Sequence, residues 1–483
     1  MKLKWQIVAA LVIFSLFIGA GGTYLGMTLL DSNEATVDQG AAKNSKNQAL
    51  TSKELDKIKK SYEFISGNYV ENIDNEEVLE GAIKGMIGTL NDPYSVYMDE
   101  ETVQQFTESL DSSFEGIGAE VSMQGGKVTI VAPFKDSPAE KAGLKPNDKI
   151  LTIDGKSIDG LDLYEAVLKI RGEKGTTVTL GIQRAGVSEP LDVKVKRDEI
   201  PIETVYADQF NINGKTIGLL EITSFSEETA KDFQEELNAL EEKGIDGLVI
   251  DVRGNPGGYL ESVEHISKIL LPGNKPYVQI EDRNGNKQRL ISSLKEKKPY
   301  PIVGLIDEGS ASASEILAAA LKEAGGYKLV GVNSFGKGTV QQTVDLGDGS
   351  NLKLTMFKWL TPDGNWIHEK GIKPTVKVEQ PDYFYANPLT VDKEPLAYDM
   401  NNDQVKNAQK MLDGLGFAPG RTDGYFSEET KQAVIAFQKK NKLEATGKID
   451  AETATKLQDN VLAEIRDRSN DLQLKTALEL AAE

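Results

Sequence analysis

Three serines stand close together where an apolar strand would give way to a helix. The stretch GLIDEGSASASEILAAAL (residues 304–321) places Ser310, Ser312 and Ser314 in the turn between the two. A serine at such a turn is exposed, and the unpaired N–H groups at the helix start can stabilise an oxyanion. The same residues could simply cap the helix. The segment therefore indicates either a nucleophile or a helix cap.

A lysine in an apolar setting follows 25 residues after Ser312. In SFGKGTVQQTVDL (residues 334–346), Lys337 stands between two glycines and close to Phe335. Desolvation lowers the pKa of a lysine from about 10.4, which makes its amine usable as a base. Gln341 lies four residues further on the same face, where its amide can orient the amine or a substrate. A single lysine near glycines is usually solvated, so this spacing alone does not decide.

A glycine-rich turn in DVRGNPGGYLESV (residues 251–263) ends another apolar strand and leads into a helix. The N–H of Gly258 could serve an oxyanion beside that of Ala313. An ordinary left-handed turn explains the same glycines equally well.

Composition removes several classes of site. Without cysteine, thiol catalysis, Cys-ligated zinc and disulfides are excluded. The only two histidines, His265 and His368, cannot form a metal site of several His ligands, and their settings are more typical of structural residues. The net charge of -20 argues against nucleic acid as a partner. We expect no metal and no cofactor.

An apolar run without charge from residue 7 to 30 is long enough, at roughly 36 Å as a helix, to cross a bilayer of about 30 Å. Lys2 and Lys4 precede it, which favours a cytoplasmic N-terminus and an extracytoplasmic remainder. A cleaved signal peptide is the alternative, but no convincing small-x-small cleavage site follows the run. We therefore predict a single-pass anchor in the cell membrane.

The elements that must position these residues fall into successive segments. After a flexible tether, Leu55, Ile58, Tyr62, Phe64 and Ile65 recur at helical spacing and must pack on the chain's own core or on a second copy. Strands and helices alternate from about residue 215 to 380, which predicts an α/β core with parallel strands. The expected boundaries are an anchor at 7–30, a tether at 31–50, a helical segment at 51–112, a small mixed domain at 113–200, the α/β core at 201–385, a linker at 386–400, a helical unit at 401–460 and a terminal helix at 461–483.

Three motifs together closely resemble the carboxyl-terminal processing, or tail-specific, serine proteases. They are GSASASE (Gly309–Glu315), FGKGTVQ (Phe335–Gln341) and DVRGNPGG (Asp251–Gly258). The segment DPYSVYM (Asp92–Met98) is also similar to that family, so the likeness covers nearly everything after the tether.

This resemblance implies a serine endopeptidase and a role for each residue. Ser312 would be the nucleophile, Lys337 the general base and Gln341 an assisting residue, with the amides of Gly258 and Ala313 as the oxyanion hole. The implied fold is multidomain α/β, with a crotonase-like protease core, a PDZ domain of the inserted type, an N-terminal helical segment and a small all-α C-terminal binding domain.

The implied PDZ domain brings its own site. Gly116, Ile117, Gly118 and Ala119 resemble a carboxylate-binding loop, whose N–H groups would hold the C-terminus of a substrate protein while the peptide pairs with the next strand. An ordinary strand-entry turn is the alternative. Arg171, in LKIRGEKG, is a candidate for coupling peptide binding to the catalytic site.

The helical unit at 401–460 resembles a three-helix peptidoglycan-binding domain through DGYF and AVIAFQ. The implied partners are therefore protein substrates with accessible C-termini, peptidoglycan, the membrane and, through the terminal helices, a second copy in a homodimer. Two other functions remain open: a cell-wall hydrolase, and a scaffold that joins wall, membrane and a protein C-terminus without catalysis.

Overall fold

The computed structural model describes residues 50–483, apart from residues 111, 125, 135–136, 146, 162, 185–186, 188 and 392–393. The predicted anchor at 7–30 and nearly all of the tether lie outside the described residues. None of the helices in the described part of the chain combines the length and the apolar character that crossing a bilayer requires.

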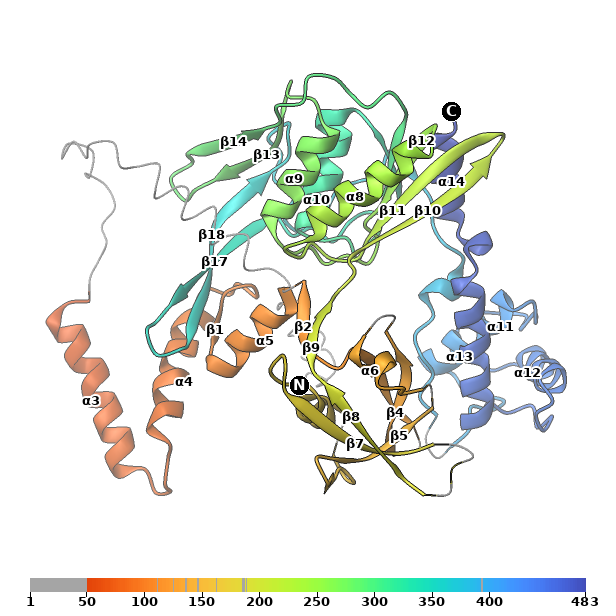
Figure 1. The fold of residues 1–483 in the computed structure, drawn as a ribbon, viewed down its shortest axis with the longest axis horizontal. Coiled ribbons are helices and arrows are strands. Elements are labelled where there is room, and N and C mark those ends of the chain that lie inside the picture. Colours follow the sequence, from red (N-terminus) through yellow and green to blue (C-terminus); the bar gives the residue numbers. More distant parts are fainter. Residues whose placement is uncertain are drawn as a thin grey trace.

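A six-stranded sheet forms the centre of the α/β unit (Figure 1). Its strands lie in the order β10 (Val205–Ile212), β11 (Lys215–Ile222), β12 (Gly247–Asp251), β15 (Ile302–Ile306), β16 (Lys328–Gly331) and β19 (Val376–Lys377). Only the pairing of β10 with β11 is antiparallel; the other four are parallel. Parallel neighbours need a crossover between them, which explains the alternation of strands and helices in the sequence.

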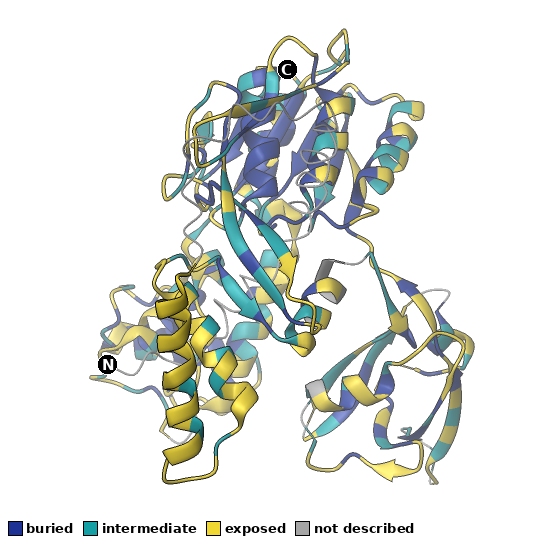
Figure 2. Cartoon of the chain, turned by 90° about the vertical axis from the view of Figure 1, so that its left-hand side faces the viewer, coloured by how far each residue is buried: buried dark blue, intermediate teal, exposed yellow. Residues whose placement is uncertain are grey.

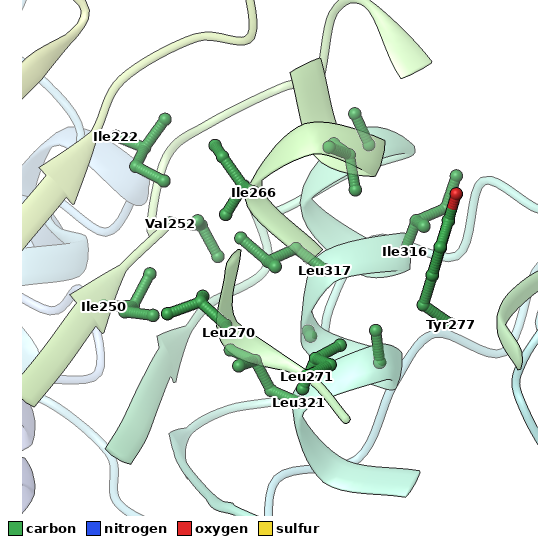
Figure 3. Packing of buried hydrophobic residues seen from close by; sticks show 14 of the residues in the cluster. Ile222, Ile250, Val252, Ile266, Leu270, Leu271, Tyr277, Ile316, Leu317 and Leu321 are labelled. Atoms are coloured by element: carbon green, nitrogen blue, oxygen red, sulfur yellow. The ribbon is translucent and has the colours of Figure 1, made fainter. Parts of the chain in front are cut away.

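Both faces of this sheet are buried, so β12 and β15 are buried at every position. One face packs against helices α8 (Thr229–Glu242), α9 (Leu260–Leu270) and α10 (Ala313–Ala319), the last of which continues as a π-helix, Ala320–Gly325. Figure 3 shows Ile222 and Ile250 of the sheet facing Ile266 and Leu270 of α9 and Leu317 of α10. The strands are thereby fixed, and their carboxyl ends become rigid points of attachment for loops.

The other face is covered by the last helix of the chain, α14 (Leu472–Ala481). Leu474 and Leu478 pack against Ile217 and Val249 of the sheet, whereas Leu472 is exposed. The expected amphipathic helix at the C-terminus is thus a structural part of the α/β unit.

A separate helical unit lies between β19 and α14 in the sequence (Figure 1). It contains α11 (Asp403–Gly414), α12 (Glu428–Lys440) and α13 (Ala451–Arg466), with short 3-10 turns at Asp382–Tyr385 and Arg468–Asn470. Leu389 and Leu396, within the stretch expected to be a linker, are buried in its core. The chain then returns to the sheet, so the α/β unit is assembled from segments on both sides of the helical one.

A buried ion pair ties this return to the loop after β12. The guanidinium of Arg253 donates to the carboxylates of Asp251, at 2.7 Å, and Asp471, at 2.8 Å. All three side chains are largely buried. Because breaking a buried pair leaves an uncompensated charge, the start of α14 and the loop after β12 hold each other in place.

A second, antiparallel sheet joins the N-terminal segment to the α/β unit. Its order is β1 (Val96–Met98), β18 (Asn351–Leu360), β13 (Pro276–Glu281) and β14 (Lys287–Ile291), and β17 (Thr339–Asp345) also pairs with β18. Strand β1 contacts two helices, α4 (Asn75–Gly88) and α5 (Glu100–Leu110), and α3 (Ser52–Asn68) contacts α4. The pairing of β1 with β18 therefore brings the loop before β1 to the strands that follow Lys337.

Helix α3 has no buried residue, and Figure 2 shows it exposed along its length. Leu55, Ile58, Phe64 and Ile65 are all exposed, Phe64 at 70%. The interpretation of this stripe as part of the chain's own core is therefore wrong.

The small mixed domain is a five-stranded sheet with a short added strand and two helices. Its order is β3 (Ala119–Gln124), β4 (Lys127–Pro133), β5 (Lys149–Ile153), β7 (Thr177–Gln183) and β8 (Leu191–Lys196), with β6 (Lys156–Ser157) on β5. Helix α6 (Pro138–Lys141) begins after Ser137, whose side chain caps it, and α7 (Leu163–Ile170) contacts β3. Strands β2 (Ser113–Gly116) and β9 (Asp198–Pro201) pair where the chain enters and leaves the domain.

Candidate active site

Ser312 occupies a strained position between β15 and α10. It is the residue immediately before the helix, with φ 53° and ψ -111°. Positive φ is uncommon for a residue with a side chain, and backbone strain of this kind is concentrated at functional sites. The helix start also leaves N–H groups beside Ser312 without helical partners.

Hydrogen bonding separates Ser312 from its neighbours. The Ser310 hydroxyl donates to the carbonyl of Val252 at 2.8 Å, and the Ser314 hydroxyl donates to that of Asn255 at the same distance. Both serines are completely buried and hold the loop after β12 against the serine turn. No carbonyl of a described residue accepts a hydrogen bond from Ser312. Of the three hydroxyls, only that of Ser312 is not used to hold a carbonyl of the loop after β12.

The loop after β12 approaches Ser312 closely at its glycines. A Cβ on Gly257 would lie 3.0 Å from the Cβ of Ser312 and 3.1 Å from the nitrogen of Ala313. A Cβ on Gly258, at φ 141°, would lie 2.2 Å from the carbonyl oxygen of Phe225. Both positions therefore require glycine, and the reason is the approach of two backbones as well as conformational freedom.

Two backbone donors are available at this contact. Neither the N–H of Gly258 nor that of Ala313 donates a hydrogen bond to any residue that the structure describes. The loop itself is fixed on either side, because Phe225 donates to the carbonyl of Gly257 and accepts from the N–H of Tyr259. Fixed, unpaired N–H groups are what a developing oxyanion needs.

Lys337 is completely buried, and its Nζ has no hydrogen-bond partner among the described residues. The nitrogen lies 4.4 Å from the centre of the Tyr94 ring. Burial, together with the positive charge of Lys353, lowers the pKa of Lys337 well below its ordinary value, although Asp92 and Glu315 act in the opposite direction. The site therefore favours the neutral amine.

Glu315 connects the turn of Ser312 with residues 334–337 through hydrogen bonds. One carboxylate oxygen accepts hydrogen bonds from the N–H groups of Ser312, at 2.9 Å, and Lys337, at 2.7 Å. The other accepts from the Ser334 hydroxyl and the N–H of Gly336. Burial raises the pKa of the Glu315 carboxyl, opposed by these four hydrogen bonds. Since Ser312 and Lys337 bind the same oxygen, their main chains lie within hydrogen-bonding reach of one atom.

Gln341 is buried on β17 in a defined orientation. Its Nε2 donates to the hydroxyls of Thr339, at 3.1 Å, and Thr355, at 2.9 Å. Its Oε1 is buried without a partner in the described part of the chain. Lys337 and Gln341 thus contribute an unpaired nitrogen and an unpaired acceptor to one region of the core.

The structure brings further residues close to Lys337 for which no role was predicted from the sequence. Tyr94 and Asp92 reach Lys337 from the segment before β1, and their only signal was the resemblance of DPYSVYM to the family. Lys353 is a second buried lysine, and burial lowers its pKa to about 8. It lies in an apolar strand pattern, and nothing in its spacing indicates that it faces the site.

We assign neither of the two histidines to the candidate catalytic residues. His265 is exposed on α9, and His368 stacks on Trp366 while its Nδ1 accepts a hydrogen bond from the N–H of Gly338. Across the residues that the structure describes, no group of His, Asp and Glu side chains is arranged to hold a metal ion.

The predicted carboxylate-binding loop lies at the edge of the mixed domain. The N–H groups of Ile117 and Gly118 have no acceptor among the described residues, and Gly118 has φ 71°. Ala119 begins β3, which is the last strand of its sheet on that side. Arg171 follows α7, with its guanidinium 4.6 Å from the centre of the Phe114 ring and its side chain beside Gly116.

Replacing Glu315 tests the connection between the two segments. We expect Glu315→Ala to lower the free energy of unfolding by on the order of 3–5 kcal/mol, because three buried N–H groups lose their acceptor. In Glu323→Ala, a half-buried carboxylate that accepts one hydrogen bond, from the N–H of Asp363, is removed. This change should lower the free energy of unfolding by about 1 kcal/mol or less. Denaturant unfolding measures both changes, and equal losses would contradict the role of Glu315.

Comparison with known proteins identifies four family models that match successive parts of the chain. Family models match as follows: the activating protease CtpB N-terminal domain at residues 16–102, a PDZ domain at 116–195, peptidase family S41 at 216–378 and a peptidoglycan binding domain at 401–457. The carboxy-terminal processing protease CtpB of Bacillus subtilis is 57% identical over 475 residues, which cover 98% of each chain. The carboxy-terminal processing protease CtpA of the same organism is 45% identical over 88% of this chain and 90% of its own length. The chain belongs to the carboxy-terminal processing serine proteases of peptidase family S41.

Proposed function

We propose that this protease cleaves peptide bonds with Ser312 as nucleophile, Lys337 as general base and Gln341 as the residue that orients the lysine amine. The observation that carries the proposal is the buried, unpaired Nζ of Lys337, whose pKa is lowered by burial. The backbone N–H of Lys337 shares the Glu315 carboxylate with that of Ser312 in its strained turn. A lysine whose pKa is lowered in this way gives up its proton more readily than a solvated ammonium, so its amine is more available as a base.

The proposed reaction proceeds through an acyl-enzyme. Neutral Lys337 takes the proton of the Ser312 hydroxyl as Oγ attacks the substrate carbonyl carbon, and the N–H groups of Gly258 and Ala313 stabilise the resulting oxyanion. The Lys337 ammonium then gives its proton to the leaving amine, and an acyl-enzyme remains on Ser312. Water, deprotonated by Lys337, releases the carboxylate product and restores the serine. We also propose that the core has a crotonase-like fold. Its parallel strands, with unpaired N–H groups at the start of a helix, support this assignment.

Substrates are recognised by their C-terminus. The free N–H groups of Ile117 and Gly118 offer donors to a terminal carboxylate, and the open edge of β3 can pair with the preceding residues of a peptide. Arg171, beside Gly116, is positioned to sense an occupied loop and to transmit that state along β2.

The catalytic part works outside the cytoplasmic membrane, next to the wall. The apolar run at 7–30 supports a membrane anchor, and the match of residues 401–457 to a peptidoglycan binding domain supports attachment to glycan. Sedimentation of residues 45–483 with purified peptidoglycan tests the second point, and a protein that stays in the supernatant would contradict it.

A homodimer would cover the exposed stripe of α3. Its apolar side chains include Ile58 and Phe64, and an exposed stripe of this kind marks an interaction surface. We expect Phe64→Asp to shift residues 45–483 towards the monomer in sedimentation equilibrium at micromolar concentration. Leu168→Asp, at an exposed leucine of the PDZ domain, is the matched control. A parental protein that is already monomeric would contradict this assembly.

Cleavage by residues 45–483 of an unfolded protein with an apolar free C-terminus tests the chemistry, with mass spectrometry as the readout. We expect Ser312→Ala and Lys337→Ala to abolish cleavage, by at least about 1000-fold, because each removes a group that reacts. Ser310→Ala loses hydrogen bonds with Val252 and Asp307, and Ser314→Ala loses one to the carbonyl of Asn255. These bonds only hold loops together, so folded protein of either kind should keep measurable activity.

Other outcomes favour the remaining hypotheses. Hydrolysis of purified wall without cleavage of protein would indicate a cell-wall hydrolase. Absence of cleavage in both assays, even with added C-terminal peptides, would indicate a scaffold, although a scaffold gives no reason for a buried lysine of lowered pKa.

A further inference from the structure

The loop before β1 reaches into the candidate active site from the N-terminal segment. Strand β1 pairs with β18, and Ser95, just before β1, is buried against Thr355 of β18. Thr355 in turn lies opposite Gln341 in the pairing of β17 with β18. Asp92 and Gln341 are therefore connected through two hydroxyl side chains, although they belong to different segments of the chain.

The hydrogen bonds in this connection have a direction. The Ser95 hydroxyl donates to Oδ2 of Asp92 at 2.6 Å and accepts from the backbone N–H of Thr355 at 3.0 Å. The Thr355 hydroxyl also hydrogen-bonds the Asp92 carboxyl. An ionised carboxylate only accepts, so the hydrogens of both hydroxyls point at Asp92.

That direction continues to Gln341. Since the single hydrogen of the Thr355 hydroxyl points at Asp92, its oxygen can only accept, and it accepts from Nε2 of Gln341 at 2.9 Å. The second hydrogen on Nε2 goes to the hydroxyl of Thr339. Both amide hydrogens are thus used, and Oε1 is left as the unpaired acceptor that a lysine amine requires.

Asp92 also acts on Lys337 directly. Burial raises the pKa of Asp92, but hydrogen bonds from Ser95, Thr355 and the N–H of Tyr94, with the charge of Lys337, outweigh burial and leave the pKa below its ordinary value. Asp92 therefore carries its charge near neutral pH and attracts a proton on Lys337. The other groups that face this lysine are Glu315 from α10, Lys353 from β18 and the ring of Tyr94.

We propose that Asp92 is a positioning residue for catalysis, which sets the orientation of the Gln341 amide through Ser95 and Thr355 and so presents Oε1 to Lys337. This inference rests on the proposed Ser312, Lys337 and Gln341 site. It assigns to the N-terminal segment a part in the reaction, because the site is incomplete without the loop before β1.

The test compares Asp92→Asn with the parental full-length protein in detergent micelles, using cleavage of an unfolded protein with an apolar free C-terminus. An asparagine can donate to the hydroxyl of Thr355, whose hydrogen then turns to Gln341 and favours the flipped amide. We expect kcat/KM to fall on the order of 10-fold or more. The acid limb of the pH profile should move to lower pH, because a negative charge that favours protonated Lys337 is gone.

Two further variants separate orientation from folding. Thr355→Val removes the hydroxyl and should lose activity as Asp92→Asn does, whereas Thr355→Ser keeps it and should restore activity to within a few-fold of the parent. Asp99→Asn removes a carboxylate from the same segment, where Asp99 caps α5 by accepting from the N–H of Thr102, and should leave kcat/KM and the acid limb unchanged.

Parental activity with an unmoved acid limb in Asp92→Asn, or equal loss in Thr355→Val and Thr355→Ser, overturns the inference. Failure of the proposed site has a different signature, because Ser312→Ala or Lys337→Ala would then still cleave the substrate.

Discussion

The burial of one amine, that of Lys337, is the constraint on which the rest of the structure depends. A charged ammonium in a completely buried position costs several kcal/mol, and the protein avoids that cost by favouring the neutral form. Every group near the amine has a bearing on this balance. Burial and the charge of Lys353 favour deprotonation, whereas the carboxylates of Asp92 and Glu315 oppose it. The outcome is a lysine whose pKa is lowered well below its ordinary value.

Besides the loop before β1, three segments of the chain meet at this site. Residues 309–315 supply the serine turn and Glu315, residues 334–341 supply Lys337 and Gln341, and residues 254–258 supply the glycines that let one backbone approach another. The sheet determines the first and third, since both follow buried parallel strands. Helix α14 holds the sheet from its far side and, through Arg253, holds the loop after β12.

The sequence predicted the parts of the site that follow from local patterns. The strand, turn and helix around Ser312 could be predicted from small residues and apolar runs, whereas the apolar setting of Lys337 left open whether its amine is buried or solvated. The local pattern could not choose among the three serines, and only the resemblance to the family singled out Ser312. What distinguishes the other two is that the hydroxyls of Ser310 and Ser314 donate to carbonyls of a distant loop. The roles of Asp92 and Lys353 depend on the pairing of β1, β17 and β18, which residue spacing does not reveal. The apolar stripe of α3 was visible, but its spacing could not tell a core from an outer surface.

Direct titration of Lys337 tests the central claim. Residues 45–483 carrying lysine labelled with carbon-13 at Cε, compared with a Lys337→Arg protein to assign the signal, report the protonation state by NMR as pH is varied. The account predicts that Lys337 is deprotonated at a pH well below the ordinary lysine value of about 10.4. A Lys337 signal that stays protonated up to that value would contradict it, because the proposed base would then be a charged ammonium at neutral pH.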